Sequence, residues 1–169
     1  TKVGTHHFLT QIDHESDPLA RKLAKLEFGT STGRQRMVGW FDSVEKGNAL
    51  RFAGFDELVI NKLDALSMEE QWDGQLRICT AYRFPDGTLT KEVPRSEDVR
   101  RTLSPVYESI DGWKEDISSI SSFEQLPEAA KTYLARMVGS LLEVAYPEGL
   151  SEHQLPQVRF VGVGPDPGQ

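Results

Sequence analysis

The alternation of hydrophobic and polar positions along this chain predicts three helices. Over 128–144 the apolar residues return every three or four positions, which is typical of an amphipathic helix packed on a core. A shorter helix is expected over 19–26, because Asp17 suits the N-cap and Pro18 suits the first helical position. A third helix is expected over 41–54, where the final glycine suits a C-terminal cap.

The same pattern predicts strands between and after these helices. The apolar run over 57–61 is typical of a short strand that is buried on both faces in a parallel sheet. Strand-like runs over 76–84 and 88–93 are joined by Pro-Asp-Gly at 85–87, which predicts a hairpin. A last strand is expected over 158–165 and ends in a glycine turn.

The order helix, helix, strand, hairpin, helix, strand predicts an α/β fold, in which a mixed sheet carries flanking helices and a β-hairpin. With 38% hydrophobic and 27% charged residues, residues 1–169 are expected to form a single domain. A formal net charge of −7 disfavours a broad basic face, so no nucleic-acid partner is expected. The sequence shows neither a long apolar run nor the residue order of a signal peptide, so a cytoplasmic location without a membrane partner is expected.

Residues with reactive side chains are few. Cys79 lies in an apolar run, which favours a small buried hydrophobic residue over a nucleophile. His6, His7 and His14 invite a metal-binding interpretation, but adjacent histidines near a terminus are more often exposed to solvent. No catalytic residue and no metal site are therefore assigned within this chain.

The stretch 27–42, Glu-Phe-Gly-Thr-Ser-Thr-Gly-Arg-Gln-Arg-Met-Val-Gly-Trp-Phe-Asp, is the most informative part of the sequence. Hydroxyl groups, a flexible glycine and two guanidinium groups suit a carboxylate or phosphate ligand. The alternative is a solvated loop whose arginines pair with surface acids. The candidate residues are Thr30, Ser31, Thr32, Gly33, Arg34 and Arg36, with Gln35 mainly a spacer between two arginines that face one cleft.

A second candidate group follows the strand over 57–61. The Asp64 carboxylate at a strand end can accept hydrogen bonds from the ring N–H and the amine of guanine, and Lys62 can cover the face of the base. Gly162 to Gly164 end another strand and offer backbone N–H groups to the same ligand. Each pattern alone also fits an incidental strand end or turn.

Five motifs in order along the chain resemble adenylosuccinate synthetase, and the resemblance covers nearly the whole chain. They are the loop at 30–36, Lys-Leu-Asp at 62–64, Pro-Val-Tyr-Glu at 105–108, Gly-Trp-Lys-Glu-Asp-Ile at 112–117 and Gly-Pro-Asp at 164–166. The resemblance is to the C-terminal part of that enzyme, which has a P-loop NTPase-like fold.

This resemblance implies a ligase that joins L-aspartate to inosine monophosphate (IMP) with GTP and Mg²⁺. It implies that the loop binds aspartate, with Arg34 also near IMP and Arg36 reaching toward GTP. It further implies that Lys62, Leu63 and Asp64 hold guanine, and that Gly162, Val163 and Gly164 close over the base. The chain departs from the family at Gly162, where serine is usual, and at Pro167, where arginine is usual.

The resemblance also implies that the phosphate loop, the catalytic Asp and His and the magnesium ligands belong to a missing N-terminal part. The chain alone is therefore expected to be inactive, and Thr1 in place of methionine favours a portion of a larger enzyme. A homodimer is plausible for the whole enzyme. The alternative is a stand-alone, non-catalytic module that binds a guanine nucleotide or another protein.

Overall fold

The computed structural model describes residues 1–2, 6–29, 33–67, 72–149 and 155–164. The candidate residues Thr30, Ser31 and Thr32 lie outside this set. The helices are α1 (Pro18–Leu26), α2 (Ser43–Ala53), α3 (Glu97–Thr102) and α4 (Glu128–Ala145), with 3₁₀ turns η1 (Leu63–Leu66) and η2 (Phe123–Gln125). The strands are β1 (Phe41–Asp42), β2 (Glu57–Ile60), β3 (Gln75–Arg83), β4 (Leu89–Thr90), β5 (Ser104–Asp111) and β6 (Gln157–Val161).

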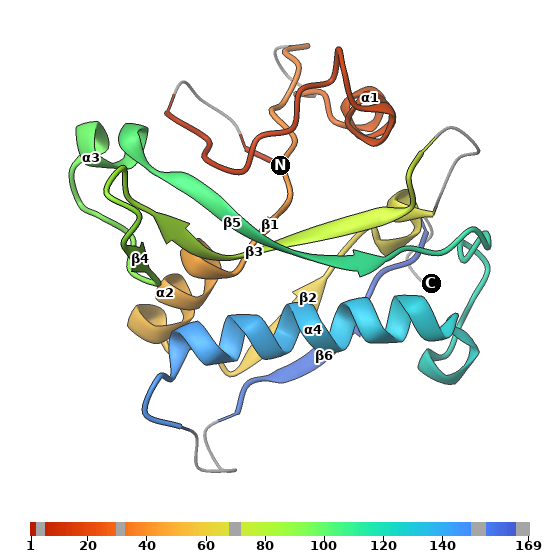
Figure 1. Cartoon of the computed structure of the whole chain (residues 1–169). Coiled ribbons are helices and arrows are strands. Elements are labelled where there is room, and N and C mark those ends of the chain that lie inside the picture. Colours follow the sequence, from red (N-terminus) through yellow and green to blue (C-terminus); the bar gives the residue numbers. More distant parts are fainter. Residues whose placement is uncertain (3–5, 30–32, 68–71, 150–154, 165–169) are drawn as a thin grey trace.

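These strands form two sheets, and the first is mixed. β3 is its centre, pairing parallel with β1 and antiparallel with β4 and β5. β2 and β6 form a separate parallel pair. α1 lies above the larger sheet and α4 runs beneath it, as Figure 1 shows. The predicted α/β fold with a mixed sheet and flanking helices is confirmed.

Both predicted helix caps are present, one at the start of α1 and the other at the end of α2. Asp17 Oδ1 accepts hydrogen bonds from the backbone N–H groups of Leu19 at 2.8 Å and Ala20 at 3.2 Å, which starts α1. Gly54 has a left-handed φ of 65° and ends α2. That helix starts at Ser43 rather than at 41, because Phe41 and Asp42 pair with β3.

The predicted hairpin is confirmed, but it is a minor part of its sheet. Gly87 has a φ of 88°, and the N–H of Phe84 donates to the Thr88 carbonyl at 2.8 Å. The long partner of β3 is β5, which the hydrophobic pattern did not predict. β5 contains Pro105 and several polar residues, so its alternation is weak.

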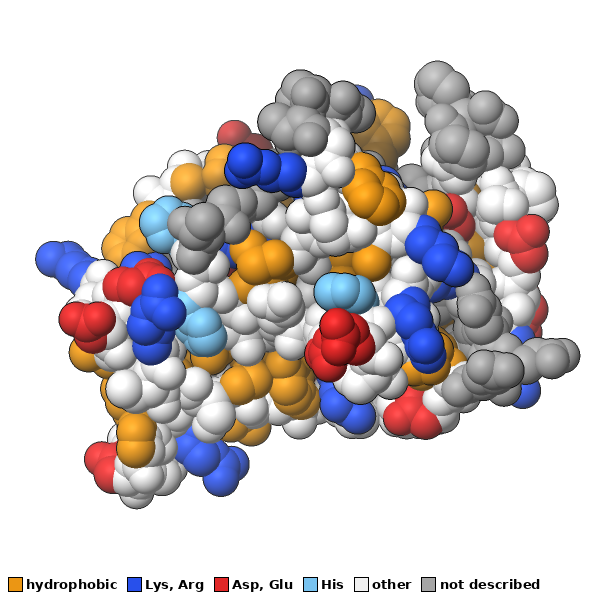
Figure 2. All heavy atoms as spheres, turned by 90° about the horizontal axis from the view of Figure 1, so that it is seen from above, with side chains coloured by type: hydrophobic (Ala, Val, Ile, Leu, Met, Phe, Trp, Pro, Cys, Tyr) orange, Lys and Arg blue, Asp and Glu red, His pale blue; other side chains and the backbone are white. Residues whose placement is uncertain are grey.

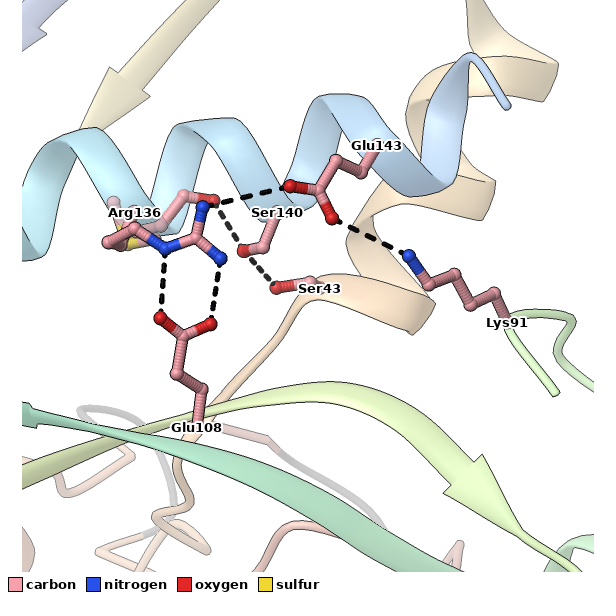
Figure 3. Close-up of polar contacts among 7 residues, drawn as sticks. Ser43, Lys91, Glu108, Arg136, Ser140 and Glu143 are labelled. Carbon is pink, nitrogen blue, oxygen red and sulfur yellow. Dashed lines mark hydrogen bonds and ion pairs between the residues drawn. The ribbon is translucent and has the colours of Figure 1, made fainter. Parts of the chain in front are cut away.

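Polar contacts attach α4 to the sheet and to α2 (Figure 3). Arg136 donates from Nε and Nη2 to the two carboxylate oxygens of Glu108, at 2.9 and 2.7 Å. The hydroxyl groups of Ser43 and Ser140 lie 2.6 Å apart in the buried contact between α2 and α4. The two-point pairing of Arg136 with Glu108 fixes the rotation of α4 as well as its position.

The stripe predicted on α4 is core packing. Its members Ala130, Tyr133, Leu134 and Met137 are buried in the main core, to which β3 contributes Leu76 and Ile78. Cys79 is also fully buried, as expected. The prediction that the strand over 57–61 is buried on both faces is wrong, because β2 pairs only with β6 among the described strands and Val59 is 56% exposed. No helix among the described residues is long and apolar enough to cross a membrane.

Candidate functional site

Glu27 joins the anion-type loop to the end of β2. Its Oε2 accepts a hydrogen bond from Arg36 Nη1 at 3.1 Å, and its Oε1 accepts one from Lys62 Nζ at 2.6 Å. The carboxylate is 7% exposed, while the side chains of Arg36 and Lys62 are 36% and 57% exposed. One buried carboxylate therefore fixes two partly exposed cations that are 26 positions apart in sequence.

The charge on this carboxylate is stabilised by its partners. Burial by itself raises the pKa of Glu27, but the hydrogen bonds and charges of Lys62 and Arg36 outweigh it and the net pKa is lowered. Glu27 is therefore ionised at neutral pH. Its role is not predictable from the sequence, since no spacing pattern marks a buried acid that pairs with two distant cations.

Gln35 anchors the loop, which corrects its interpretation as a spacer. Its Nε2 donates to the backbone carbonyls of Ala24 at 2.7 Å and Glu27 at 3.0 Å. Each of these carbonyls also accepts a backbone hydrogen bond, from the N–H of Glu27 at 3.2 Å and of Arg36 at 3.0 Å, so Gln35 adds a second bond to each. A backbone bridge between Phe28 and Gln35 closes the loop, and Gly33 has a left-handed φ of 61° at its tip.

The two loop arginines differ in their surroundings. Arg36 is half-buried and paired with Glu27, and its Nε is buried without a hydrogen-bond partner in the described part of the chain. Arg34 is exposed, and its side chain makes no hydrogen bond or ion pair with the described residues. The guanidinium of Arg34 is therefore open to solvent, whereas the Nε–H of Arg36 is a buried donor.

The end of β2 is fixed by the core and by the segment after β6. Leu63 is 1% exposed, and its N–H donates to the Gly162 carbonyl at 2.9 Å. The Gly162 N–H in turn donates to the Ile60 carbonyl at 2.7 Å. Val163 is buried in the same core as Leu63. The residues at 62–64 and 162–164 are therefore neighbours, as the sequence analysis expected from their positions at strand ends.

Lys62 and Asp64 project from this anchored backbone. Lys62 is the one non-glycine residue with a left-handed φ, 63°, in the part of the chain that the structure describes. This uncommon conformation turns the chain directly into η1, in which Asp64 is half-buried. η1 is held against α1 by Lys22, whose Nζ donates to the Ser67 carbonyl at 3.0 Å.

The structure has room at Gly162 for the serine that the family resemblance leads us to expect there. A Cβ built there would lie 3.4 Å from Asn61 Oδ1, its nearest contact. The residues around Gly162 therefore do not require glycine at this position, and a serine hydroxyl group would fit.

The surface around the loop is mixed in charge. Figure 2 looks down on this face, where basic side chains stand in separate groups among acidic, hydrophobic and uncharged ones. The described residues contain no cluster of three or more His, Cys, Asp or Glu side chains arranged for a metal ion.

Comparison with known proteins identifies the family. The sequence model of the family described as adenylosuccinate synthetase matches residues 1–147. The chain belongs to the adenylosuccinate synthetase family. Among curated relatives, the adenylosuccinate synthetase of Desulfitobacterium hafniense (strain DSM 10664 / DCB-2) is 38% identical over 165 residues, covering 98% of this chain and 34% of that protein. The adenylosuccinate synthetase of Bacillus cereus is 36% identical over 169 residues, covering 100% of this chain and 35% of that protein.

A solved structure of the family agrees with the fold. The fully ligated adenylosuccinate synthetase from Plasmodium falciparum matches with a TM-score of 0.81 and 29% identity over 99% of this chain. The match covers 36% of that structure. The chain therefore spans about a third of the length of the adenylosuccinate synthetases that it matches.

Glu27→Gln is expected to lower the free energy of unfolding by about 1–2 kcal/mol at pH 7, because charged hydrogen bonds are lost but both cations stay partly solvated. The folded-state pKa of Glu27 is below its ordinary value of 4.5, so this contribution is complete above that value and is lost as the pH falls through the lowered pKa. Urea unfolding of both proteins from pH 7 to pH 3 measures the difference.

The matched control for this prediction is Glu92→Gln. Glu92 pairs with Arg51 on the surface and is 63% exposed, so its replacement is expected to cost less than about 0.5 kcal/mol. Equal losses for the two variants, or a loss for Glu27→Gln that does not shrink in acid, would contradict the bridging role of Glu27.

Proposed function

We propose that this chain is the aspartate- and guanine-binding part of an adenylosuccinate synthetase, a ligase of purine biosynthesis that joins L-aspartate to IMP. In that reaction GTP phosphorylates the purine oxygen of IMP, and the amino group of aspartate displaces the phosphate with the help of Mg²⁺. The observation that carries the proposal is the bridge from Glu27 to Arg36 and Lys62, which links the loop to the end of β2.

The loop supplies the anion-binding side of the proposed site. The exposed guanidinium of Arg34 suits the carboxylate of aspartate and the phosphate of IMP, because its planar fork binds two oxygens at once. An oxygen beside Arg36 Nε would satisfy a buried donor that has no partner among the described residues. Thr30, Ser31, Thr32 and Gly33 are assigned to aspartate in the same proposal.

The strand ends supply the guanine-binding side. The half-buried Asp64 is assigned to the ring N–H and amine of guanine, and Lys62 to the face of the base. Leu63 and Val163 keep this backbone in place because both belong to the buried core. Gly162 and Gly164 are assigned to the edge of the base next to them.

Catalysis is assigned to the part of the synthetase that this chain lacks. No catalytic residue and no metal ligand is assigned here, so GTP and Mg²⁺ act in the whole enzyme and residues 1–169 alone are inactive. A single domain, a cytoplasmic location and a homodimer of the whole enzyme belong to the same proposal.

Calorimetric titration with GTP, IMP and L-aspartate tests the proposal. Two proteins are titrated: the chain alone, and a chimera in which this chain replaces the matching part of the Bacillus cereus relative. Both proteins are also assayed for product, and we expect the chimera to form adenylosuccinate and the chain alone to form none. Tight GTP binding by the chain alone would instead favour an independent nucleotide-binding module, and a folded but inactive chimera would reject the synthetase assignment.

Asp64→Asn in the chimera is expected to weaken the preference for GTP over other nucleoside triphosphates by about 1–3 kcal/mol, because a charged acceptor facing two donors is lost. The ratio of kcat/KM values for GTP and inosine triphosphate, which lacks the exocyclic amine, measures this preference. Asp73→Asn is the control, since Asp73 lies before β3 and is assigned to no ligand. An unchanged ratio in Asp64→Asn would remove Asp64 from the guanine site.

A further inference from the structure

The side chain of Asn61 lies beside the end of β6. Asn61 comes directly after β2 and is exposed. Among atoms outside residues 161–163, its Oδ1 is the nearest to the position that a Cβ at Gly162 would take, at 3.4 Å. The amide makes no hydrogen bond with any residue that the structure describes. A group that can both donate and accept is therefore unused at the place where the proposed guanine side begins.

Position 162 offers no donor of its own to a ligand. The N–H of Gly162 donates to the Ile60 carbonyl at 2.7 Å, so it is already used within the strand pair. Glycine also lacks the hydroxyl group of the serine that the family resemblance leads us to expect there. The position of the Cβ that would carry this hydroxyl lies next to the Asn61 amide. The nearest side-chain donor at this place is therefore Asn61.

Guanine presents two different edges to hydrogen-bonding groups. Its ring N–H and exocyclic amine are donors, and the Asp64 carboxylate is assigned to them. Its O6 and N7 atoms are acceptors, which an ionised carboxylate cannot bind. A half-turn about the last side-chain bond of Asn61 exchanges its oxygen and its NH₂ group, so the amide can present a donor beside Gly162. Asn61 and Asp64 thus have complementary chemistry on either side of Lys62 in the sequence.

We infer that Asn61 is a further specificity-determining residue, which donates a hydrogen bond from Nδ2 to the acceptor edge of guanine, at O6 or N7. It supplies the polar group that Gly162 lacks, so the departure at one position is compensated by its neighbour in space. This inference rests on the proposed function, because it adds a residue to the guanine side. The alternative is an exposed amide that contacts only water.

Two GTP analogues test the inference in the chimera. 7-deaza-GTP lacks the N7 acceptor, and in 6-thio-GTP a sulfur atom replaces O6 and accepts hydrogen bonds more weakly. Both keep the N–H and the amine that are assigned to Asp64. Asn61→Ala is expected to lower the ratio of kcat/KM values for GTP over one of these analogues about 3-fold to 10-fold, because one neutral hydrogen bond is lost. The ratio for GTP over inosine triphosphate is expected to stay within about twofold of its original value, since the bonds to Asp64 remain.

Two further variants separate this contact from a general loss of structure. Gln157→Ala removes an exposed amide at the opposite end of the β2–β6 pair, where Gln157 pairs with Glu57, and is expected to change none of these ratios. Gly162→Ser added to Asn61→Ala is expected to restore at least half of the lost preference, because a hydroxyl group then stands beside the position that the amide has left. Unchanged ratios in Asn61→Ala, or the same change in Gln157→Ala, would overturn the inference.

Failure of the inference and failure of the proposed function give different results. If Asp64→Asn changes the preference for GTP over inosine triphosphate while Asn61→Ala leaves both analogue ratios unchanged, the guanine site stands and the role of Asn61 is overturned. If the chimera binds GTP but forms no adenylosuccinate, the ratios are taken from Kd values, and a lowered ratio supports the role of Asn61 while the ligase assignment is rejected. If neither the chimera nor the chain binds GTP, both are overturned.

Discussion

Replacing Arg34 by leucine is expected to reduce kcat/KM for aspartate in the chimera about 10-fold to 150-fold. The guanidinium is exposed at the loop tip and is assigned to a carboxylate, and each charged hydrogen bond that it forms contributes about 1.5–3 kcal/mol. The fold is expected to be unaffected, because this side chain makes no polar contact with the described residues. Steady-state kinetics with aspartate, IMP and GTP varied in turn measure the effect.

The matched control is Arg95→Leu, which removes an exposed guanidinium far from the loop in sequence and assigned to no ligand. It is expected to leave kcat/KM for aspartate unchanged. Arg34→Lys keeps the charge but loses the two-point geometry, so an intermediate loss is expected. If Arg34→Leu matches the control, the loop does not bind aspartate through this residue.

Replacing Gly47 by alanine is expected to lower the free energy of unfolding by about 1–3 kcal/mol. Alanine normally stabilises a helix interior relative to glycine by about 1 kcal/mol. Here its Cβ would lie 2.5 Å from Val144 Cβ and 2.8 Å from the Leu141 carbonyl oxygen, so α2 and α4 must move apart. Urea unfolding monitored by circular dichroism measures the change.

Gly139→Ala is the control on the facing helix. Its new Cβ has open space, so this substitution is expected to stabilise the isolated chain by up to about 1 kcal/mol. Opposite signs for the two variants would show that contact between the helices, rather than helix propensity, keeps glycine at position 47. A stabilising Gly47→Ala would contradict the close packing.

The elements that the sequence predicted are those with strong local signals. The cap residues Asp17 and Gly54 and the turn glycine Gly87 act within a few residues, and the stripe on α4 needs only helical spacing. β5 was not predicted, because its register against β3 depends on pairing between distant residues. The exposure of β2 was not predicted either, since an apolar run cannot show how many strands will cover it.

The candidate site was predicted in part for the same reason. Backbone and packing contacts place residues 62–64 beside 162–164, as expected from strand ends. The roles of Gln35 and Glu27 depend on where α1 ends and on which side chains reach it, so they required coordinates. The assignments to aspartate, IMP and GTP stay predictions until the variants are measured.

The pairing of β2 with β6 also bears on how the chain acquires its structure. Glu57 pairs with Gln157, so this contact closes a loop of about a hundred residues, whereas β3 and β4 meet across a short turn. Long-range pairing is slow, because the entropy of closing the loop is lost before the contact stabilises it. During synthesis on the ribosome, the backbone at 61–64 cannot take its final place until β6 has left the exit tunnel. Nucleotide binding of the proposed kind would therefore appear only after β6 has emerged from the ribosome.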